Sequence, residues 1–225
     1  PKMAELIPRI CKTAKESFFL FGPRGTGKTT WLKLKFSDAL WVDLLEPDLF
    51  RTYSAKAERL GEVVRGSNKK VVVIDEVQRV PELLTVIHSL MEEKLGIQFV
   101  LTGSSSRKLK RAGVDMLAGR AVKQTLHPFM AAELGKHFNL ENALKHGLIP
   151  LVVNSPDQQK VLKTYAALYV REEVQMEGFV RNIGNFSRFL EAISFSHGSL
   201  LNISNVAREC EVERKVVEGY ISILE

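Results

Sequence analysis

The chain has 225 residues, of which 45% are hydrophobic and 26% are charged. These proportions are typical of an ordinary globular protein and exclude a largely disordered or membrane-embedded chain. The formal net charge of +6 permits binding to nucleic acid but does not require it, because many basic proteins bind none. Cys11 and Cys210 are far apart and have no metal-ligand spacing, so neither a disulfide framework nor a zinc site is expected.

The termini and the apolar runs give expectations about location and completeness. No apolar run approaches the roughly 20 residues that span a bilayer, and no basic segment followed by an apolar one opens the chain. We therefore expect a cytoplasmic protein without a membrane partner. Pro1 stands where an initiator Met would, and residues 216–224 are still amphipathic where the sequence stops, so we expect the natural protein to be longer.

The first half of the chain alternates strand and helix patterns. Val71–Ile74 is a run of four β-branched residues, which is typical of a strand buried on both faces of a parallel sheet. Alternating strands and helices predict right-handed crossovers and therefore an α/β fold, a parallel five-stranded sheet with helices on both faces. The expected strands are 17–21, 39–43, 71–74, 97–101 and 121–126, and the expected helices are 28–36, 46–60 and 81–95.

From Phe129 onward the strand pattern fades and helical periodicity replaces it. Breaks near Gly135 and between Gly178 and Gly184 predict three parts. These are a core at 1–134, a helical lid or linker at 135–180, and the start of a winged-helix-like unit at 181–225. The expected helices are 129–138, 140–146, 158–175, 186–195, 203–210 and 214–224.

The last two helical segments resemble a helix-turn-helix inside a winged-helix unit. The helix that would read DNA carries charges of both signs, at Glu213, Arg214, Lys215 and Glu218. This face leaves three interpretations open: contact with DNA, contact with a protein, or a purely structural role.

Residues 22–29 read GPRGTGKT and match the pattern of a phosphate-binding loop, between an expected strand and an expected helix. Glycines let backbone N–H groups turn toward the phosphates, and the helix directs its positive end at them. Lys28 is expected to reach the β- and γ-phosphates, and the Thr29 hydroxyl to bind Mg²⁺. The expected nucleotide contacts are Gly22, Pro23, Arg24, Gly25, Thr26, Gly27, Lys28, Thr29 and Thr30, with no separate role for Arg24.

Asp75 and Glu76 follow the buried strand 71–74 and come to the edge of the sheet where ligands of parallel sheets bind. We expect Asp75 to hold Mg²⁺ through water and Glu76 to orient and polarise the water that attacks the γ-phosphate. The alternative is a strand that ends in two solvated acids.

Three further features each have a functional and a structural interpretation. Ser104 or Ser105 is expected either to bond the γ-phosphate or to cap the helix that begins at Arg107. Arg120 either neutralises phosphate charge, in its own subunit or in a neighbour's, or is a surface arginine. The basic residues of 107–111 either touch nucleic acid or form a solvated helix face.

The sequence also bears on the choice of base and metal. Asn68-Lys69-Lys70-Val71 lacks the aspartate of the guanine-reading NKxD pattern, so adenine is the favoured base. None of the five histidines has a paired or HExxH spacing, so no transition-metal site is expected.

These motifs together resemble bacterial and archaeal AAA+ ATPases in which the core precedes a C-terminal domain of unknown function with a winged-helix start. The resemblance implies ATP and Mg²⁺, a five-stranded core followed by a helical lid, and Arg120 as the usual arginine. The stretches that carry it are Leu20–Trp31, Val71–Pro81, Leu101–Leu109, Leu117–Arg120, His127–Phe129 and Tyr169–Phe189.

Our first hypothesis is an ATPase, converting ATP to ADP, whose cycle repositions the helical C-terminal part. DNA, a partner protein and further copies of the chain are its candidate partners. The rival is an ATP-gated switch or DNA-binding regulator with slow turnover. A small-molecule kinase is a third interpretation. Glu76 and the hydroxyl cluster at residues 102–106 argue against it, because they favour water as the nucleophile.

Overall fold

The computed structural model describes residues 6–103, 117–169, 183–196 and 198–224. The chain forms two compact units, Pro1–Pro156 and Asp157–Glu225, and each is considered by itself. The sheet and the helical segments up to residue 153 belong to the first unit. The domain boundaries predicted at 134 and 180 stay predictions.

The first unit is built on a five-stranded parallel sheet with the strand order β2-β3-β4-β1-β5. This confirms the α/β fold predicted from the alternating pattern. Strand β4 lies between β1 and β3, so the end of β4 stands between the loop that follows β1 and the acids that follow β3. The strands are β1 (Phe18–Phe21), β2 (Leu40–Asp43), β3 (Val71–Asp75), β4 (Gln98–Gly103) and β5 (Val122–Thr125).

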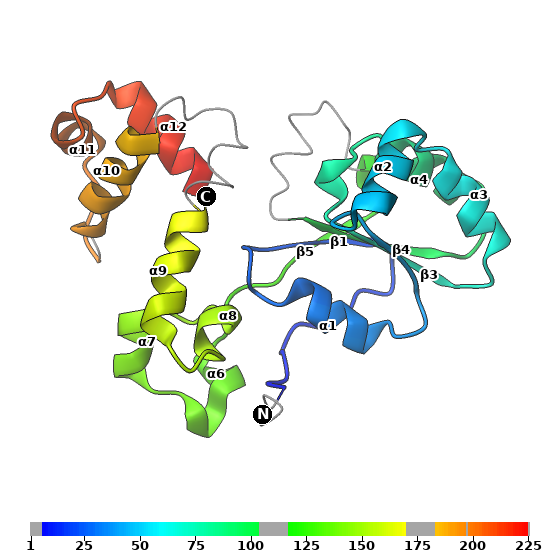
Figure 1. The fold of residues 1–225 in the computed structure, drawn as a ribbon, viewed down its shortest axis with the longest axis horizontal. Helices are drawn as coiled ribbons and strands as arrows, with labels where there is room; N and C mark the ends of the chain where they lie inside the picture. The colour runs from blue at the N-terminus through cyan, green and yellow to red at the C-terminus, as the bar shows by residue number, and fades with distance from the viewer. Residues whose placement is uncertain (1–5, 104–116, 170–182, 197, 225) are drawn as a thin grey trace. The chain divides into compact units, whose positions relative to one another are not determined.

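Helices cover both faces of the sheet, as Figure 1 shows. Helix α1 (Lys28–Lys35) lies on one face, and the other carries α2 (Pro47–Ala55), α3 (Arg59–Gly66) and α4 (Leu83–Glu92). The two faces have separate apolar cores, and the helices therefore close the sheet on both sides.

The side chains of β1 show how the alternation of a strand supplies both cores. Phe18 and Leu20 pack with Trp31 of α1, whereas Phe19 and Phe21 point into the core under α2, α3 and α4. All four β1 side chains are at most 3% exposed. Burial of one such side chain contributes about 1.5–3 kcal/mol, so this strand is fixed firmly just before the loop that follows it.

Three elements differ most clearly from the sequence-based expectation. The single helix expected over 46–60 is interrupted, because Lys56 has an extended backbone (φ −154°, ψ 92°) that ends α2, and α3 follows. The helix expected over 129–138 is the short α6 (Ala131–Leu134) with a 3₁₀ turn, broken where Gly135 takes a positive φ of 50°. Helix α8 (Pro150–Val153) was not expected at all.

Several of the later helices begin at a side-chain cap. Asn139 caps α7 (Leu140–His146) through the N–H of Asn142, and Asp157 caps α9 (Gln158–Leu168) through the N–H of Lys160. Such caps satisfy N–H groups that the first turn leaves without partners.

The second unit gathers α10 (Ile183–Ser194), α11 (Ile203–Glu209) and α12 (Arg214–Leu224) around a small aromatic core. The Phe186 and Tyr220 rings meet edge to face with centroids 5.1 Å apart, and Phe189 completes the group. None of the helices in the described part of the chain combines the length and the apolar character that a bilayer crossing requires.

Candidate functional site

The loop between β1 and α1 has a backbone that depends on its glycines. Gly22, Gly25 and Gly27 have positive φ values of 152°, 80° and 83°. At Gly22 a Cβ atom would lie 2.2 Å from the carbonyl oxygen of Leu126, so a larger residue does not fit. Helix α1 begins directly after the loop at Lys28, and the N–H groups of its first turn therefore point out of the helix toward the loop.

Lys28 lies across its own loop. Its ammonium group donates to the carbonyl oxygens of Gly22 (2.7 Å) and Pro23 (3.2 Å), and the residue is 7% exposed. The fully buried Thr26 hydroxyl donates to the same Pro23 oxygen at 2.9 Å. The loop is therefore closed around a cation, as a site for an anionic ligand requires.

Asp75 at the end of β3 meets the start of α1. Alternation along β3 gives Asp75 the same face as Val73, which packs in the core under α1. The Thr29 hydroxyl donates to Asp75 Oδ2 at 2.6 Å, and the Thr102 hydroxyl donates to Asp75 Oδ1. The carboxylate is 1% exposed, so two hydroxyl groups satisfy a charge that is almost removed from water.

Glu76 follows in the left-handed backbone conformation (φ 60°, ψ 45°). For a non-glycine residue this conformation costs about 1–3 kcal/mol and persists only where the surroundings enforce it. The Glu76 N–H donates to Thr102 Oγ1 at 2.9 Å, and Gln78 Nε2 donates to the Glu76 carboxylate. Thr102 thus joins the two acids, a role that the hydroxyl at the end of a buried strand could have suggested.

A second anchor reaches the loop from the N-terminal segment. Arg9 donates to the Thr26 carbonyl oxygen at 2.8 Å and pairs with Glu133 at 3.0 Å, and the Arg9 and Glu133 side chains are 9% and 1% exposed. Burial by itself raises the pKa of Glu133, but the N–H groups of Met130 and Ile10 and the Arg9 guanidinium outweigh this effect. The pKa of Glu133 therefore lies below its ordinary value, and the carboxylate is charged at neutral pH.

The helical segment at residues 149–153 contacts the loop from another direction. The Leu151 N–H donates to the Gly25 carbonyl oxygen at 3.3 Å. A Cβ atom at Gly25 would lie 3.2 Å from Leu151 Cβ and 3.3 Å from Ile149 Cγ2. Two other segments therefore bond the carbonyl groups of the loop: Arg9 bonds the carbonyl of Thr26, and Leu151 bonds the carbonyl of Gly25.

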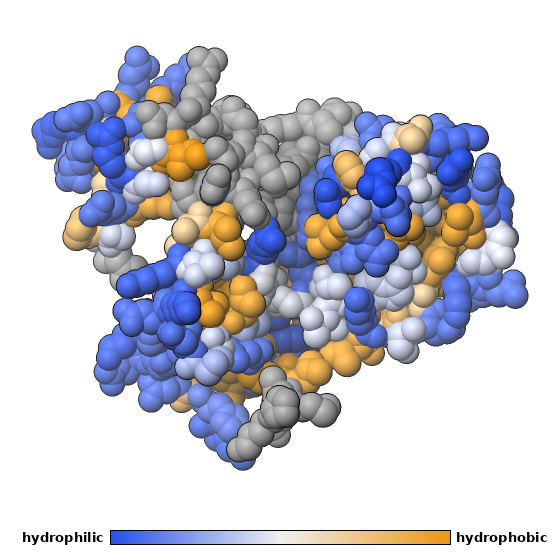
Figure 2. All heavy atoms as spheres, in the orientation of Figure 1, coloured by the Kyte–Doolittle hydropathy of each residue, from blue (hydrophilic) through white to orange (hydrophobic). Residues whose placement is uncertain are grey.

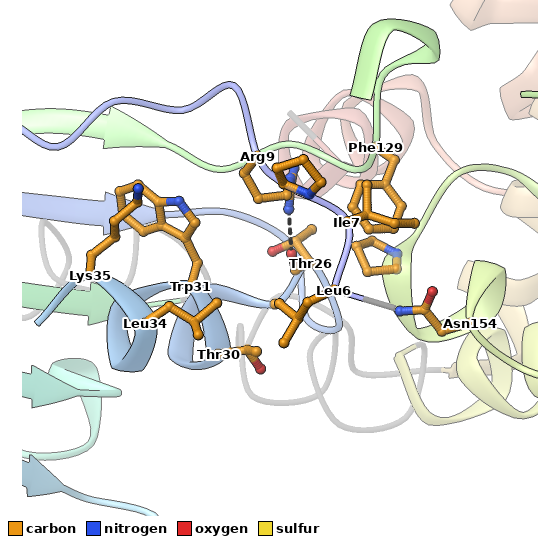
Figure 3. Close-up of a pocket in the computed structure, with 13 residues that line it drawn as sticks. Leu6, Ile7, Arg9, Thr26, Thr30, Trp31, Leu34, Lys35, Phe129 and Asn154 are labelled. Carbon is orange, nitrogen blue, oxygen red and sulfur yellow. Dashed lines mark hydrogen bonds between the residues drawn. The ribbon is translucent and has the colours of Figure 1, made fainter. Parts of the chain in front are cut away.

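A cavity of about 500 Å³ opens beside the loop, between the N-terminal segment and α1 (Figure 3). Leu6 and Leu34 at this cavity are 60% and 57% exposed, and apolar residues gather on the surface over α1 in the space-filling view (Figure 2). The cavity is lined by Leu6, Ile7, Pro8, Arg9, Thr26, Gly27, Thr30, Trp31, Leu34, Lys35, Phe129, Pro150 and Asn154.

Arg120, one of the residues singled out from the sequence, is not brought to the loop. Arg120 pairs with Glu92 at the end of α4 (2.6 Å; side chains 42% and 55% exposed), and none of the hydrogen bonds of the described residues joins it to 22–30. Ser104 and the basic cluster at 107–111 lie outside the described residues. The roles expected for Arg120 and Ser104 stay predictions.

The parallel sheet, the glycine loop and the acids at the end of β3 define the class as a P-loop NTPase fold. Within this class the chain belongs to the AAA domain family AAA_14, which it matches over residues 14–135. Residues 137–225 match a second family, described as a domain of unknown function (DUF8612).

Curated relatives share the sequence at a low level. The chain is 24% identical over 212 residues to uncharacterised proteins of Mycobacterium bovis and Mycobacterium tuberculosis, with 91% of this chain covered. The match covers 46% of each relative, so the chain spans about half of their length.

Three solved structures are similar to the chain at 15–16% identity. Two are from Aeropyrum pernix: the ORC1 protein in complex with DNA (TM-score 0.37; 94% of this chain, 78% of that chain) and the ORC2 protein in its ADP form (0.44; 93% and 79%). The third is a structure on katanin self-assembly (0.39; 92% and 71%). The fold assignment rests on the sheet, the loop and the family match.

Proposed function

We propose that the chain binds ATP together with Mg²⁺ and hydrolyses it to ADP and phosphate. The observation that carries the proposal is the 2.6 Å hydrogen bond between Thr29 and Asp75. It joins the first turn of α1 to the end of β3, so the loop that suits phosphates and the acids that suit a cation form one site. Membership of the AAA domain family supports the same chemistry.

The oxygen atoms of Thr29 and Asp75 fit Mg²⁺. Magnesium is usually held by one or two protein oxygens, several waters and the phosphates of its nucleotide. Thr29 would bind the ion directly and Asp75 through water. The bound ion would neutralise charge on the β- and γ-phosphates.

Each charged group of the loop has a distinct role in the proposal. Lys28 leaves the carbonyl oxygens of Gly22 and Pro23 and binds the β- and γ-phosphates, which offer a full charge in place of two dipoles. Glu76 accepts a hydrogen bond from the attacking water and orients it in line with the γ-phosphate. Water is therefore the nucleophile that this site serves.

The cavity beside the loop suits the base. It adjoins Thr26 and Gly27, so a nucleotide with its phosphates in the loop can extend into it. Its lining is mainly apolar with a few polar groups, which is typical of small-molecule and cofactor sites. A stacked base would cover Leu6 and Leu34, two apolar side chains that are otherwise more than half exposed.

Hydrolysis is proposed to act on the helical part through the loop. Arg9 and Leu151 bond the loop at Thr26 and Gly25, so a shift of these carbonyl groups on phosphate binding reaches segments 6–10 and 149–153 first. DNA, a partner protein and further copies of the chain are the candidate effectors, and Arg120 would act on the phosphates of its own or a neighbouring subunit. We also propose that residues 181–225 form a winged-helix-like unit.

The second candidate is an ATP-gated switch or DNA-binding regulator with slow turnover. The hydrogen bonds that hold Glu76 in a strained backbone favour the hydrolytic reading, because a protein that only senses nucleotide does not need an oriented carboxylate beside Asp75. A slow turnover that neither DNA nor protein concentration changes would instead favour the switch.

The experiment is phosphate release by the purified chain, with calorimetric titration of Mg-ATP. We expect Lys28→Ala to abolish binding and Glu76→Gln to retain binding while losing turnover by about 100-fold or more. Glu58→Gln removes an exposed acid of the same type and serves as the control. Normal turnover in Glu76→Gln would refute the assignment, and assays with duplex DNA at several salt and protein concentrations separate the candidate effectors.

A further inference from the structure

Gln78 stands two residues after Glu76 and holds its carboxylate. Gln78 Nε2 donates to Glu76 Oε2. An ionised carboxylate can only accept hydrogen bonds, so the amide of Gln78 must present its NH₂ group to Glu76 and turn its oxygen away. The orientation of the amide is therefore fixed by the charge of its neighbour.

The other end of the same amide occupies the space that the missing side chain of Gly103 leaves open. Gln78 Oε1 is buried and has no hydrogen-bond partner among the described residues. It lies against Gly103, the last residue of β4, where a Cβ atom would come within 2.7 Å of it. A buried acceptor without a donor is unfavourable, and such an atom calls for an explanation. The contact with Glu76 explains it, because the NH₂ group must face the carboxylate and the oxygen is left on the other side.

The backbone that carries Gln78 is fixed on both sides. Val77 is fully buried in the core. Arg79 donates to the Leu44 carbonyl oxygen at 2.7 Å, and its guanidinium lies 4.5 Å from the centre of the Phe50 ring. The short 3₁₀ turn Val77–Arg79 therefore offers the Gln78 side chain from a rigid base.

We propose that Gln78 is the positioning residue that fixes the Glu76 carboxylate in the orientation in which it acts on the attacking water. This inference rests on the proposed hydrolysis. Gln78 touches neither the nucleotide nor the water in this role. Without its amide the Glu76 side chain would populate several rotamers, so a smaller fraction of the bound enzyme would be aligned for the reaction. Phosphate binding, which depends on the loop, would not change.

The first test compares two Gln→Met variants. Gln78→Met keeps the length of the side chain and removes its hydrogen bond, and we expect kcat to fall about tenfold or more. The KM for ATP and the Kd of Mg-ATP should stay within about twofold of the wild-type values, since only a step after binding is affected. Gln124→Met on β5 is the matched control, because Gln124 is also partly buried and its Oε1 is also buried without a partner.

The second test moves Gln78 without replacing it. The backbone of Gly103 is not in the left-handed region, so Gly103→Ala acts mainly through its Cβ, which would push the Gln78 amide aside. We expect Gly103→Ala to lower kcat in the wild type and to have little further effect in Gln78→Ala. Additive losses would contradict the contact.

The outcomes separate the inference from the function on which it rests. Gln78→Met with wild-type or faster turnover, or with a loss that Gln124→Met matches, overturns the inference and leaves the hydrolysis intact. A wild-type chain that binds no Mg-ATP or releases no phosphate overturns the proposed function itself.

Discussion

Replacing Arg9 by alanine tests whether the N-terminal segment holds the loop. Arg9 pairs with Glu133 at 3.0 Å with both side chains at least nine-tenths buried, and it also donates to the Thr26 carbonyl oxygen. Removing one partner of a buried ion pair leaves the other charge uncompensated and costs about 3–5 kcal/mol. The remaining N–H donors to Glu133, from Ile10 and Met130, reduce this cost without removing it.

The expected change in melting temperature follows from this free energy. For a chain of this size each 1 kcal/mol lowers the melting temperature by about 2–4 °C, so the full cost would lower it by about 6–20 °C. Because the remaining donors reduce the cost, Arg9→Ala should fall in the lower part of this range. Differential scanning calorimetry is the suitable assay, because the chain has two units that can unfold separately. The loss should appear in the transition of the first unit.

A surface ion pair provides the control for Arg9→Ala. Arg51 pairs with Asp48 on α2 with side chains 70% and 89% exposed, and such pairs contribute about 0–1 kcal/mol. Arg51→Ala should therefore leave the melting temperature almost unchanged. If Arg9→Ala has the same melting temperature as Arg51→Ala, the buried pair does not hold the N-terminal segment. The affinity for Mg-ATP should fall with Arg9→Ala alone, since Arg9 also lines the cavity.

Three other variants probe the loop and its anchors. Thr29→Ala should raise the Mg²⁺ concentration needed for half-maximal phosphate release by about tenfold, and Thr29→Ser should restore it. Gly25→Ala should weaken nucleotide binding more than Gly96→Ala. Both glycines have a positive φ, but only a Cβ at Gly25 would crowd Leu151. Equal binding by the two variants would show that contact with Leu151 does not shape the loop. The pKa of Glu133 is lowered by folding, so its stabilisation is complete above the ordinary value of 4.5 and is lost as the pH falls through the lower folded value. Glu133→Gln should therefore unfold with a flatter pH dependence below about pH 5 in denaturant titrations.

The fold was predictable because its signals are local. Val72–Ile74 and the apolar β1 are buried on both faces, and each pattern fixes its strand without information from elsewhere in the chain. The helix breaks were harder to predict. Lys56 leaves the helical conformation although no glycine or proline marks this position in the sequence. The break lets both α2 and α3 place side chains in the same core, which is a tertiary effect.

The candidate site was predictable to the extent that its chemistry lies in contiguous motifs. The loop pattern identified Lys28 and Thr29, and the strand end identified Asp75, whose contact with Thr29 follows from strand alternation and the helix start. Their roles toward a nucleotide remain proposals. Arg9 and Glu133 gave no such signal, because they are 124 residues apart and only the tertiary fold makes them neighbours.

Gln78 shows why the orientation of a group is harder to predict than its presence. The motif places an acid after β3, but the direction of the Glu76 carboxylate depends on three contacts: the Thr102 hydroxyl at its N–H, the Gln78 amide at its side chain, and the open space at Gly103 that admits this amide. Thr102 and Gly103 belong to β4, whereas Gln78 lies only two residues after Glu76, and none of the three contacts has a periodic pattern. A group that must act on one water needs its rotamer fixed as well as its charge. The residues that fix it are therefore found where β3 and β4 end side by side, and the strand order in the sheet decides which residues these are.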